Sequence, residues 1–555
     1  MSLPQSALPE VPAETARVAH KAFRKGHPWL LLRQELPDLY DNTAFADLYS
    51  DTGQPGYAPW RLALVSLLQF AEQLSDEQAA DAVRSRLEWK YLLALPLDDG
   101  GFDSSGLSEF RARLLAHDTD TRLFDLLLTR CQERGWLKER GTQRTDATHV
   151  LAAVHKLSRL ELVLQSLAHT LETLAAVAPE WVVQTCPAAW GERYGARLNE
   201  WHLPTKDAAR EALAAQAGGD GHALLQAVWH AAEPYAWLRQ VPALEALRRI
   251  WVQEFSFTAP GCQWRTKADG RPAAAQQIRS PHEVEARYAE KRGHGWTGYK
   301  VHLTETCEAE TPHLITQVTT TVATTADVTA LPAIQSDLAA RDCLPQNQLV
   351  DAGYVEAAAL VSSEVKYGIA LCGPPLRDTS WQARAGAGFA AADFQLDWTR
   401  RQATCPGGHT SASWIEKHEH QQPPMIQIKF SRTDCGACPL REQCTQTKEQ
   451  RRSLTILPQV EWEALQRARQ RTQTPEHQKQ YAARAGIEGT ISQTVRRSDL
   501  RQARYVGLVK THLQSVLTVT AINLVRILNW LTGEPRARTR RSRFRQPLTP
   551  LPVTG

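Results

Sequence analysis

The feature that most constrains the fold is the order of strand-like and helical segments after residue 140. The segment "RTDATHVLAAVH" precedes a long helical stretch, residues 156–254, and two β-branched segments follow, "GWTGYKVHLTETCE" and "HLITQVTTTVATTAD". A helical segment, the short apolar segment "NQLVDAGYV" and the segment "YGIALCGPP" come next. This order predicts an α/β fold with large insertions. We expect the first three strands to form an antiparallel meander, which the fourth joins after a helix.

Flanking segments have a different character. Residues 40–140 are predicted to be helical, with apolar residues three or four apart and a capping box at Ser75 and Gln78. They suit a DNA-binding module of helix-turn-helix character as well as a helical packing domain. Residues 376–455 are predicted to be irregular, residues 458–490 to form one long charged helix, and residues 506–531 to form a final helix.

Charge is concentrated near the end of the chain. The net charge is +4, yet residues 496–545 hold twelve Lys and Arg against two acidic residues. Such a basic segment on a mildly acidic body suggests a polyanionic partner. The N-terminal residues do not form a signal peptide, and no run of 18 apolar residues occurs. These features predict a cytoplasmic protein that does not enter a membrane.

Three acidic residues occupy positions that suit metal binding. Asp146 lies in or at the end of the first strand, Asp351 ends the fourth, and Glu488 lies on a late helix. A carboxylate within an apolar strand is costly unless it is paired, protonated or bound to metal. Two carboxylates at neighbouring strand ends and a third from a helix can hold two Mg²⁺ ions about 4 Å apart, which suits phosphodiester chemistry. The alternative is that the aspartates are ordinary caps or turn formers.

The motifs "TDATHV", "LVDAGYV" and "YAARAGIEGT", in this order, resemble those of the DDE transposases of bacterial insertion sequences. The segment from "PGYAPWRLALVSLLQF" to "SEFRARL" resembles the N-terminal domain of several such families, and "GWTGYKVHLTET", "TCPGGHTS", "DCGACPLREQC" and "RRSDLRQARYVGLVKTHLQ" resemble blocks of one subgroup. The resemblance covers roughly residues 40–532. It implies an RNase H-like mixed sheet, and Mg²⁺- or Mn²⁺-dependent cleavage of DNA followed by strand transfer.

The third acid of related families lies in a signature of Tyr, Arg, Glu and Lys, which Tyr481, Arg484 and Glu488 match here. Spacings of three and four residues place the three side chains on one helix face. The resemblance implies that Glu488 binds metal and that Tyr481 and Arg484 contact backbone phosphate. Val495 stands where the Lys is expected, and the neighbouring arginines are candidates to supply that charge. The alternative is a solvated helix face.

A cluster of cysteines is a candidate zinc site. Cys405, Cys435, Cys438 and Cys444 include one Cys-x₂-Cys knuckle, and four thiolates on such turns suit tetrahedral Zn²⁺. His409, His418 and His420 are possible substitutes for one ligand. The alternative is a group of reduced, partly buried cysteines. The six other cysteines are interpreted as packing residues.

Basic residues beyond Glu488 are candidates for DNA contact, or else form a solvated basic face: Arg496, Arg497, Arg501, Arg504 and Lys510. The tail holds six arginines between Arg536 and Arg545 and is expected to bind DNA while disordered. The tryptophans of the helical insertion are interpreted as core residues, although they could also hold a DNA hairpin or a partner subunit.

Together these features predict seven regions. They are a helical DNA-binding or dimerisation domain (1–140), the first core strand (141–155), a helical insertion (156–256), the continued core (257–375), a cysteine-bearing insertion (376–457), the C-terminal core helices (458–532) and the basic tail (533–555). The predicted partners are the terminal inverted repeats, target DNA and a second copy of the chain. Three alternatives remain open: an inactive, transposase-derived DNA-binding protein, a metal-dependent nuclease of the same fold, and a zinc-containing regulator.

Overall fold

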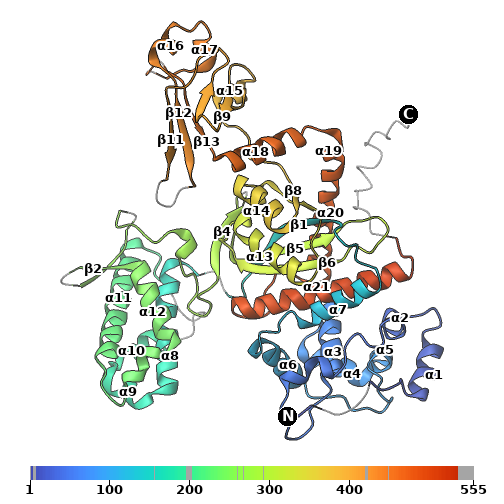
Figure 1. Ribbon diagram of the computed structural model, residues 1–555. Helices are drawn as coiled ribbons and strands as arrows, with labels where there is room; N and C mark the ends of the chain where they lie inside the picture. Colours follow the sequence, from blue (N-terminus) through green and yellow to red (C-terminus); the bar gives the residue numbers. More distant parts are fainter. Residues whose placement is uncertain are drawn as a thin grey trace.

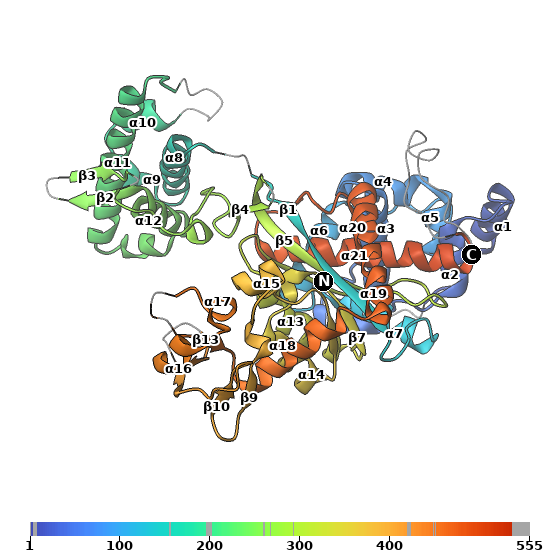
Figure 2. The same cartoon turned by 90° about the horizontal axis from the view of Figure 1, so that it is seen from above.

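A central mixed sheet organises the chain, and three other bodies surround it (Figure 1). The computed structural model describes residues 2–3, 8–154, 157–195, 203–258, 261–266, 268–291, 293–418, 423–447, 449 and 451–535. In both views the helical insertion lies to the left of the sheet and the N-terminal helices lie to its right (Figure 2).

The sheet has six strands in the order β4-β5-β1-β7-β8, with β6 also paired to β5. Their bounds are Thr142–Leu151 (β1), Arg287–Lys291 (β4), His294–Thr306 (β5), Ile315–Val322 (β6), Asn347–Leu349 (β7) and Ala370–Cys372 (β8). Strand β5 is antiparallel to β1, β4 and β6, whereas β7 is parallel to both β1 and β8. The predicted meander of three strands, and the fourth strand that joins it after a helix, are confirmed.

The two faces of the sheet are covered by different helices. The helices α20 (Gly486–Ser498) and α21 (Leu508–Leu531) lie on the face that includes Asp146 and Glu305. The opposite face packs against α13 (Asp327–Ala340) and the short turn η5 (Ala352–Tyr354), and α14 (Ala357–Tyr367) follows that turn. This mixed α/β arrangement is consistent with an RNase H-like core.

Helix α21 joins the sheet to the N-terminal domain. Its residues Leu513 and Leu517 belong to the N-terminal hydrophobic core, while Val516 and Val519 belong to the core beneath the sheet. The N-terminal domain is helical, as predicted, and the capping box at Ser75 is confirmed. Its elements are α1 (Ala13–Ala22), α2 (Pro28–Glu35), η1 (Thr43–Leu48), α3 (Pro59–Glu72), α4 (Asp76–Ser85), α5 (Leu87–Leu92), α6 (Ser105–Ala116) and α7 (Arg122–Glu133).

The helical insertion between β1 and β4 has a core of its own. It contains α8 (Arg159–Val177), α9 (Pro179–Thr185), α10 (Ala189–Tyr194), α11 (Asp207–His230), η3 (Ala236–Gln240), α12 (Pro242–Glu254), β2 (Phe255–Thr258), β3 (Gly261–Trp264) and, further on, η4 (Ala274–Gln276). Buried residues of this core extend as far as Ile278, and the partly buried Val284 packs against it. The prediction that its tryptophans are core residues is confirmed for Trp251, which is fully buried, but wrong for Trp229 and Trp237, which are 42% and 44% exposed.

The cysteine-bearing insertion is more regular than predicted. An antiparallel sheet of β11 (Ser413–Lys417), β12 (Met425–Lys429) and β13 (Ser453–Ile456) packs with the hairpin of β9 (Gln395–Asp397) and β10 (Gln402–Thr404). Short helical elements complete it: α15 (Trp381–Ala385), η6 (Ala391–Asp393), α16 (Arg432–Ala437) and α17 (Arg441–Cys444). The prediction of an irregular segment was wrong, because these strands are too short for a clear alternating pattern in the sequence.

The prediction of a single long helix over residues 458–490 was also wrong. The chain forms α18 (Gln459–Arg471), α19 (Pro475–Ala482) and the turn η7 (Ala483–Ala485) before α20 begins. Thr472 is the C-cap of α18. Thr474 caps α19, since its side chain accepts a hydrogen bond from the His477 N–H, and Pro475 follows at the first helical position. The predicted final helix corresponds to α21.

The arginine-rich tail from Arg536 to Arg545 lies outside the described residues. Across the described part of the chain, every helix is too short or too polar to cross a lipid bilayer.

A buried histidine makes the stability of the sheet sensitive to acid. His302 on β5 is fully buried, and its ring nitrogens contact the hydroxyl groups of Tyr354 at 2.6 Å and Thr321 at 3.3 Å. Burial lowers the pKa of His302 to about 4, while Asp327 opposes this shift and Lys300 adds to it. The unfolded chain therefore binds a proton that the folded chain excludes between pH 6.5 and about 4.

We expect the free energy of unfolding to fall as the pH drops through this window, by roughly 3 kcal/mol for this one group. His302→Gln keeps a hydrogen-bonding side chain without a titrating group and should lose this part of the dependence. Urea unfolding of both proteins between pH 7 and pH 4 measures the difference. Equal acid sensitivity of the two proteins would contradict the prediction.

Candidate active site

The two aspartates lie side by side on neighbouring parallel strands. Asp146 is in the middle of β1, and Asp351 lies two residues beyond the end of β7. The parallel register places Arg144 beside Leu349, and its extension by two residues sets Asp146 beside Asp351. The sheet topology therefore brings together two carboxylates that are far apart in the sequence.

Arg484 connects the first aspartate to the glutamate. Its Nη2 atom lies 2.8 Å from Oδ2 of Asp146, and its Nη1 atom lies 3.8 Å from Oε1 of Glu488. The side chains of Arg484 and Asp146 are 15% and 12% exposed, whereas that of Glu488 is 71% exposed. Asp146 and Arg484 thus form a partly buried ion pair, and Glu488 stands at its open side.

Tyr481 fixes the preceding helix to the end of β7. Its hydroxyl donates a hydrogen bond to the Val350 carbonyl at 3.1 Å, one residue before Asp351. Asp351 itself caps η5, because its Oδ1 atom accepts the Gly353 N–H at 2.9 Å. The signature residues Tyr481, Arg484 and Glu488 therefore all lie at the two aspartates, although a 3-10 turn interrupts the helix between them.

The surroundings of Asp146 disfavour the charged form of its carboxyl group. Burial raises the pKa of its carboxyl group, Arg484 opposes this rise, and the negative charge of Asp351 adds to it. Lys291, near the tip of the β4–β5 hairpin, also acts to lower this pKa. A further positive charge near Asp146 and Asp351 would be stabilised.

The basic residues beyond Glu488 point in different directions. Arg501 contacts the first strand, since its Nε atom donates to the Thr148 hydroxyl at 2.9 Å. Arg504 instead donates to the Leu74 carbonyl in the N-terminal domain at 3.0 Å. Arg496 and Lys510 are exposed to solvent. A role for these residues in DNA contact stays a prediction.

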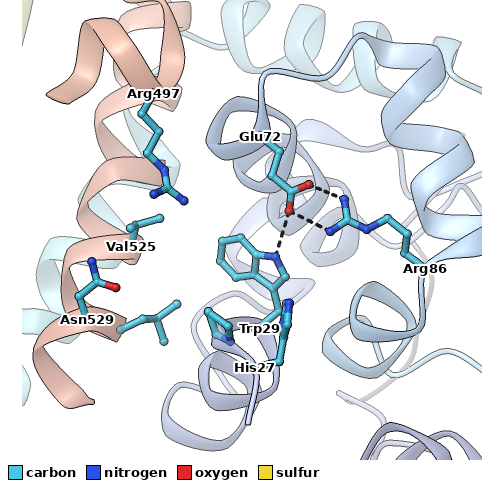
Figure 3. Close-up of a pocket in the computed structure, with 9 residues that line it drawn as sticks. His27, Trp29, Glu72, Arg86, Arg497, Val525 and Asn529 are labelled. Atoms are coloured by element: carbon cyan, nitrogen blue, oxygen red, sulfur yellow. Dashed lines mark hydrogen bonds and ion pairs between the residues drawn. The ribbon is translucent and has the colours of Figure 1, made fainter. Parts of the chain in front are cut away.

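Arg497 lies in a pocket between the N-terminal domain and the last two helices (Figure 3). Across this pocket Trp29 donates its indole N–H to Glu72 at 3.1 Å, and Arg86 forms an ion pair with the same carboxylate. Asn529 of α21 lines the same pocket. Arg497 is nine residues beyond Glu488, two and a half helical turns, so it faces away from the acids.

Reasoning from the sequence missed the side chains that hold α20 against the sheet. Arg144 and Glu305 are both buried, and they form an ion pair at 2.6 Å across the β1–β5 pairing. The signal was present in "HLTET", where a carboxylate ends a β-branched strand. The same argument that selected Asp146 applies to Glu305.

The four predicted zinc ligands, Cys405, Cys435, Cys438 and Cys444, line a single pocket together with His409. Burial raises the pKa of the Cys444 thiol, and the other three cysteines contribute to the rise. Within the described residues, however, no group of three or more His, Cys, Asp or Glu side chains is arranged to hold a metal ion, either here or at the acids. His418 is described and lies outside this pocket, and His420 lies outside the described residues.

Comparison with known families found two matches. The family described as "Transposase DDE domain" matches residues 404–528, and the family described as "Transposase domain (DUF772)" matches residues 17–113. The first range includes Glu488 and the four clustered cysteines, whereas Asp146 and Asp351 lie between the two ranges. Searches of curated proteins and of solved structures gave no match.

Both matched families are transposase domains, and they occur here in one chain around a mixed α/β core. These two matches support a DDE transposase of insertion-sequence type.

A glycine at the start of α20 allows the close approach of this helix to β1. A Cβ atom on Gly486 would lie 1.8 Å from Nη1 of Arg144, whereas one on Gly489 in the same helix would meet nothing within 4 Å. We expect Gly486→Ala to lower the free energy of unfolding by about 1–3 kcal/mol through overpacking. The control Gly489→Ala should instead raise it by up to about 1 kcal/mol, through helix propensity. Thermal unfolding of both variants checks this, and equal shifts would refute it.

Proposed function

We propose that this protein is an active transposase with an RNase H-like core. It would cleave DNA at the terminal inverted repeats of its element and then join the freed 3′-hydroxyl group to target DNA. The observation that carries the proposal is that Arg484 contacts both Asp146 and Glu488, while the β1–β7 register sets Asp351 beside Asp146. Two ends have to be held together for transfer, so we expect a homodimer to be the active form.

The donor chemistry of this site fits Mg²⁺ or Mn²⁺, which prefer carboxylate oxygens. Asp146, Asp351 and Glu488 would hold two such ions, provided that Arg484 leaves its place between Asp146 and Glu488. Bound ions of this kind activate a water or 3′-hydroxyl nucleophile and stabilise the leaving oxygen of a phosphodiester.

The remaining side chains support this chemistry without taking part in bond formation. Once Arg484 is released from Asp146, its guanidinium group can bind a backbone phosphate in a bidentate manner. The Nε atom of Arg484 is buried and has no hydrogen-bond partner among the described residues, which favours an acceptor that arrives with the substrate. Tyr481 would keep α19 against β7 while Arg484 moves.

The test compares the wild-type protein with Glu488→Gln on DNA that carries the ends of the element, with Mg²⁺ or Mn²⁺ present. Gln preserves the shape and removes the charge, so we expect a loss of cleavage of roughly 10³-fold, corresponding to several kcal/mol of charge stabilisation. Glu476→Gln removes the same charge from an exposed position on α19 and should leave cleavage unchanged.

Other outcomes separate the alternatives. Equal cleavage by wild type and Glu488→Gln would contradict the assignment of the third acid. Cleavage without any joined product would favour a nuclease. Tight binding to the ends without cleavage by the wild-type protein would favour a DNA-binding protein that has lost catalysis.

We also propose that the cysteine cluster binds a structural Zn²⁺ ion. Four thiols line one pocket, and they come from the turn after β10 and from the two short helices α16 and α17. Thiolates are the ligands that Zn²⁺ prefers in closed structural sites, and binding would draw the four sulfur atoms together.

Metal analysis of the purified protein tests this proposal. We expect about one Zn²⁺ per chain in the wild type and a clear loss in Cys438→Ser, as in four-cysteine structural sites. Cys186→Ser, a half-buried position in the helical insertion, is the matched control and should retain zinc. A wild-type protein that is folded and free of zinc after expression with added zinc would overturn the proposal.

A further inference from the structure

Four elements of the core meet at the carboxylate of Glu305. This side chain on β5 is 0% exposed. Its Oε1 atom accepts a hydrogen bond from Nε of Arg144 on β1 at 2.6 Å. Its Oε2 atom accepts from Nη1 of Arg526 on α21 at 2.8 Å and from the hydroxyl of Thr490 on α20 at 2.6 Å. One buried carboxylate thus connects two strands with the two helices that cover them.

Two of the residues that contact Glu305 lie next to the candidate active site. Arg144 precedes Asp146 by two residues and therefore lies on the same face of β1. Its Nη1 atom also donates to the Ala483 carbonyl at 2.7 Å, next to Arg484. Thr490 follows Glu488 by two residues on α20. Two of the residues that contact Glu305 thus lie two positions away from a candidate metal-binding acid.

Arg526 closes the network from the side of α21. Its Nη2 atom donates to the Thr490 hydroxyl at 2.7 Å and to Oε1 of Gln493 at 2.9 Å. Both acceptors lie on α20, and both lie beyond Glu488 in the helix. Helix α20 is therefore attached by side-chain hydrogen bonds at Thr490 and Gln493, while the Glu488 side chain in its first turn is exposed.

The charges of the network favour an ionised carboxylate. Burial opposes ionisation of Glu305, but Arg526, Arg144 and the Thr490 hydroxyl together lower the pKa of its carboxyl group. An ionised carboxylate only accepts hydrogen bonds, and all three neighbours donate one. The Thr490 hydroxyl therefore donates to Glu305, and this hydrogen bond holds the face of α20 that carries Thr490 against β5.

We propose that Glu305 is a positioning residue, which acts through Thr490 to set the place of Glu488 and Arg484 relative to Asp146. This inference rests on the proposed function of the three acids. A buried ion pair adds little net stability compared with apolar packing, so the value of this network lies in the single arrangement that it selects. Side chains that support metal-binding residues in this way typically change metal affinity about 10–100-fold when they are replaced.

Thr490→Val tests the inference because it removes only the hydroxyl that joins α20 to Glu305. Thr494→Val is the matched control: Thr494 is buried one turn later on the same helix, and its hydroxyl donates only to the Thr490 carbonyl, at 2.8 Å. Thr490→Ser restores the hydroxyl. For the full-length variants, Mn²⁺ binding without DNA is measured by titration calorimetry, and cleavage is measured against Mg²⁺ and end-DNA concentration.

We expect Thr490→Val to weaken Mn²⁺ binding and to raise the Mg²⁺ requirement of cleavage about tenfold or more. The KM for end DNA should stay unchanged, and Thr490→Ser should recover most of the loss. Thr494→Val should lower thermal stability to a similar extent without changing metal binding. If Thr490→Val and Thr494→Val bind Mn²⁺ equally, Glu305 is a structural residue only and the inference is wrong.

A second variant keeps the test open if Thr490→Val does not fold. Gln493→Met removes the other polar link between Arg526 and α20 at a half-buried position, and the same two outcomes apply. Failure of the proposed function can be told apart from failure of the inference about Glu305. If the proposed function is wrong, Glu488→Gln will cleave DNA and bind Mn²⁺ like the wild type. If Glu488→Gln is inactive but Thr490→Val binds Mn²⁺ as well as its control Thr494→Val does, only the role of Glu305 is overturned.

Discussion

The buried contact of Glu305 with Arg144, Arg526 and Thr490 is the interaction on which the rest of the core depends. Removal of one partner from such a network leaves an unpaired buried charge and typically costs about 3–5 kcal/mol. The network has no equivalent arrangement, because each donor comes from a different element. It therefore forces β1, β5, α20 and α21 into one relative placement, and the candidate active site lies directly beside it.

Helix α21 extends this constraint to the N-terminal domain. Its apolar residues face two cores, and two of its polar residues, Asn523 and Arg526, bond to the sheet. Asn523 exchanges two hydrogen bonds with the backbone of Ile315, at 2.7 and 2.8 Å, while Arg526 pairs with Glu305. In the sequence these residues only interrupt an apolar run. In the fold they lock α21 to β6 and β5, so the N-terminal helices and the acids share one rigid support.

Local patterns in the sequence predicted five of the six core strands, all but β4, and they selected Asp146, Asp351 and Glu488 as candidates whose roles stay a prediction. Such patterns, which are β-branched runs and carboxylates in apolar segments, are visible within a few residues. They were insufficient for Glu305, whose partners Arg144 and Arg526 are 161 and 221 residues away along the chain. The three-stranded sheet around the cysteines was missed for a related reason. Its strands are stabilised by pairing and by a small shared core, and neither leaves a periodic signal in segments of four or five residues.

Asp146 and Glu488 differ in how much freedom their side chains have, because they lie in different kinds of element. Asp146 sits within a paired strand and is 12% exposed, whereas Glu488 sits in the first turn of a helix and is 71% exposed. Arg484 contacts both carboxylates. When Arg484 leaves, Asp146 stays fixed in its strand, whereas the Glu488 side chain can move. The fixed acid then defines where a cation binds, and the exposed acid adjusts to it. That adjustment is confined to the exposed Glu488 side chain, because Ile487 beside it is buried in the core and Thr490 and Gln493 hold the next turn in place.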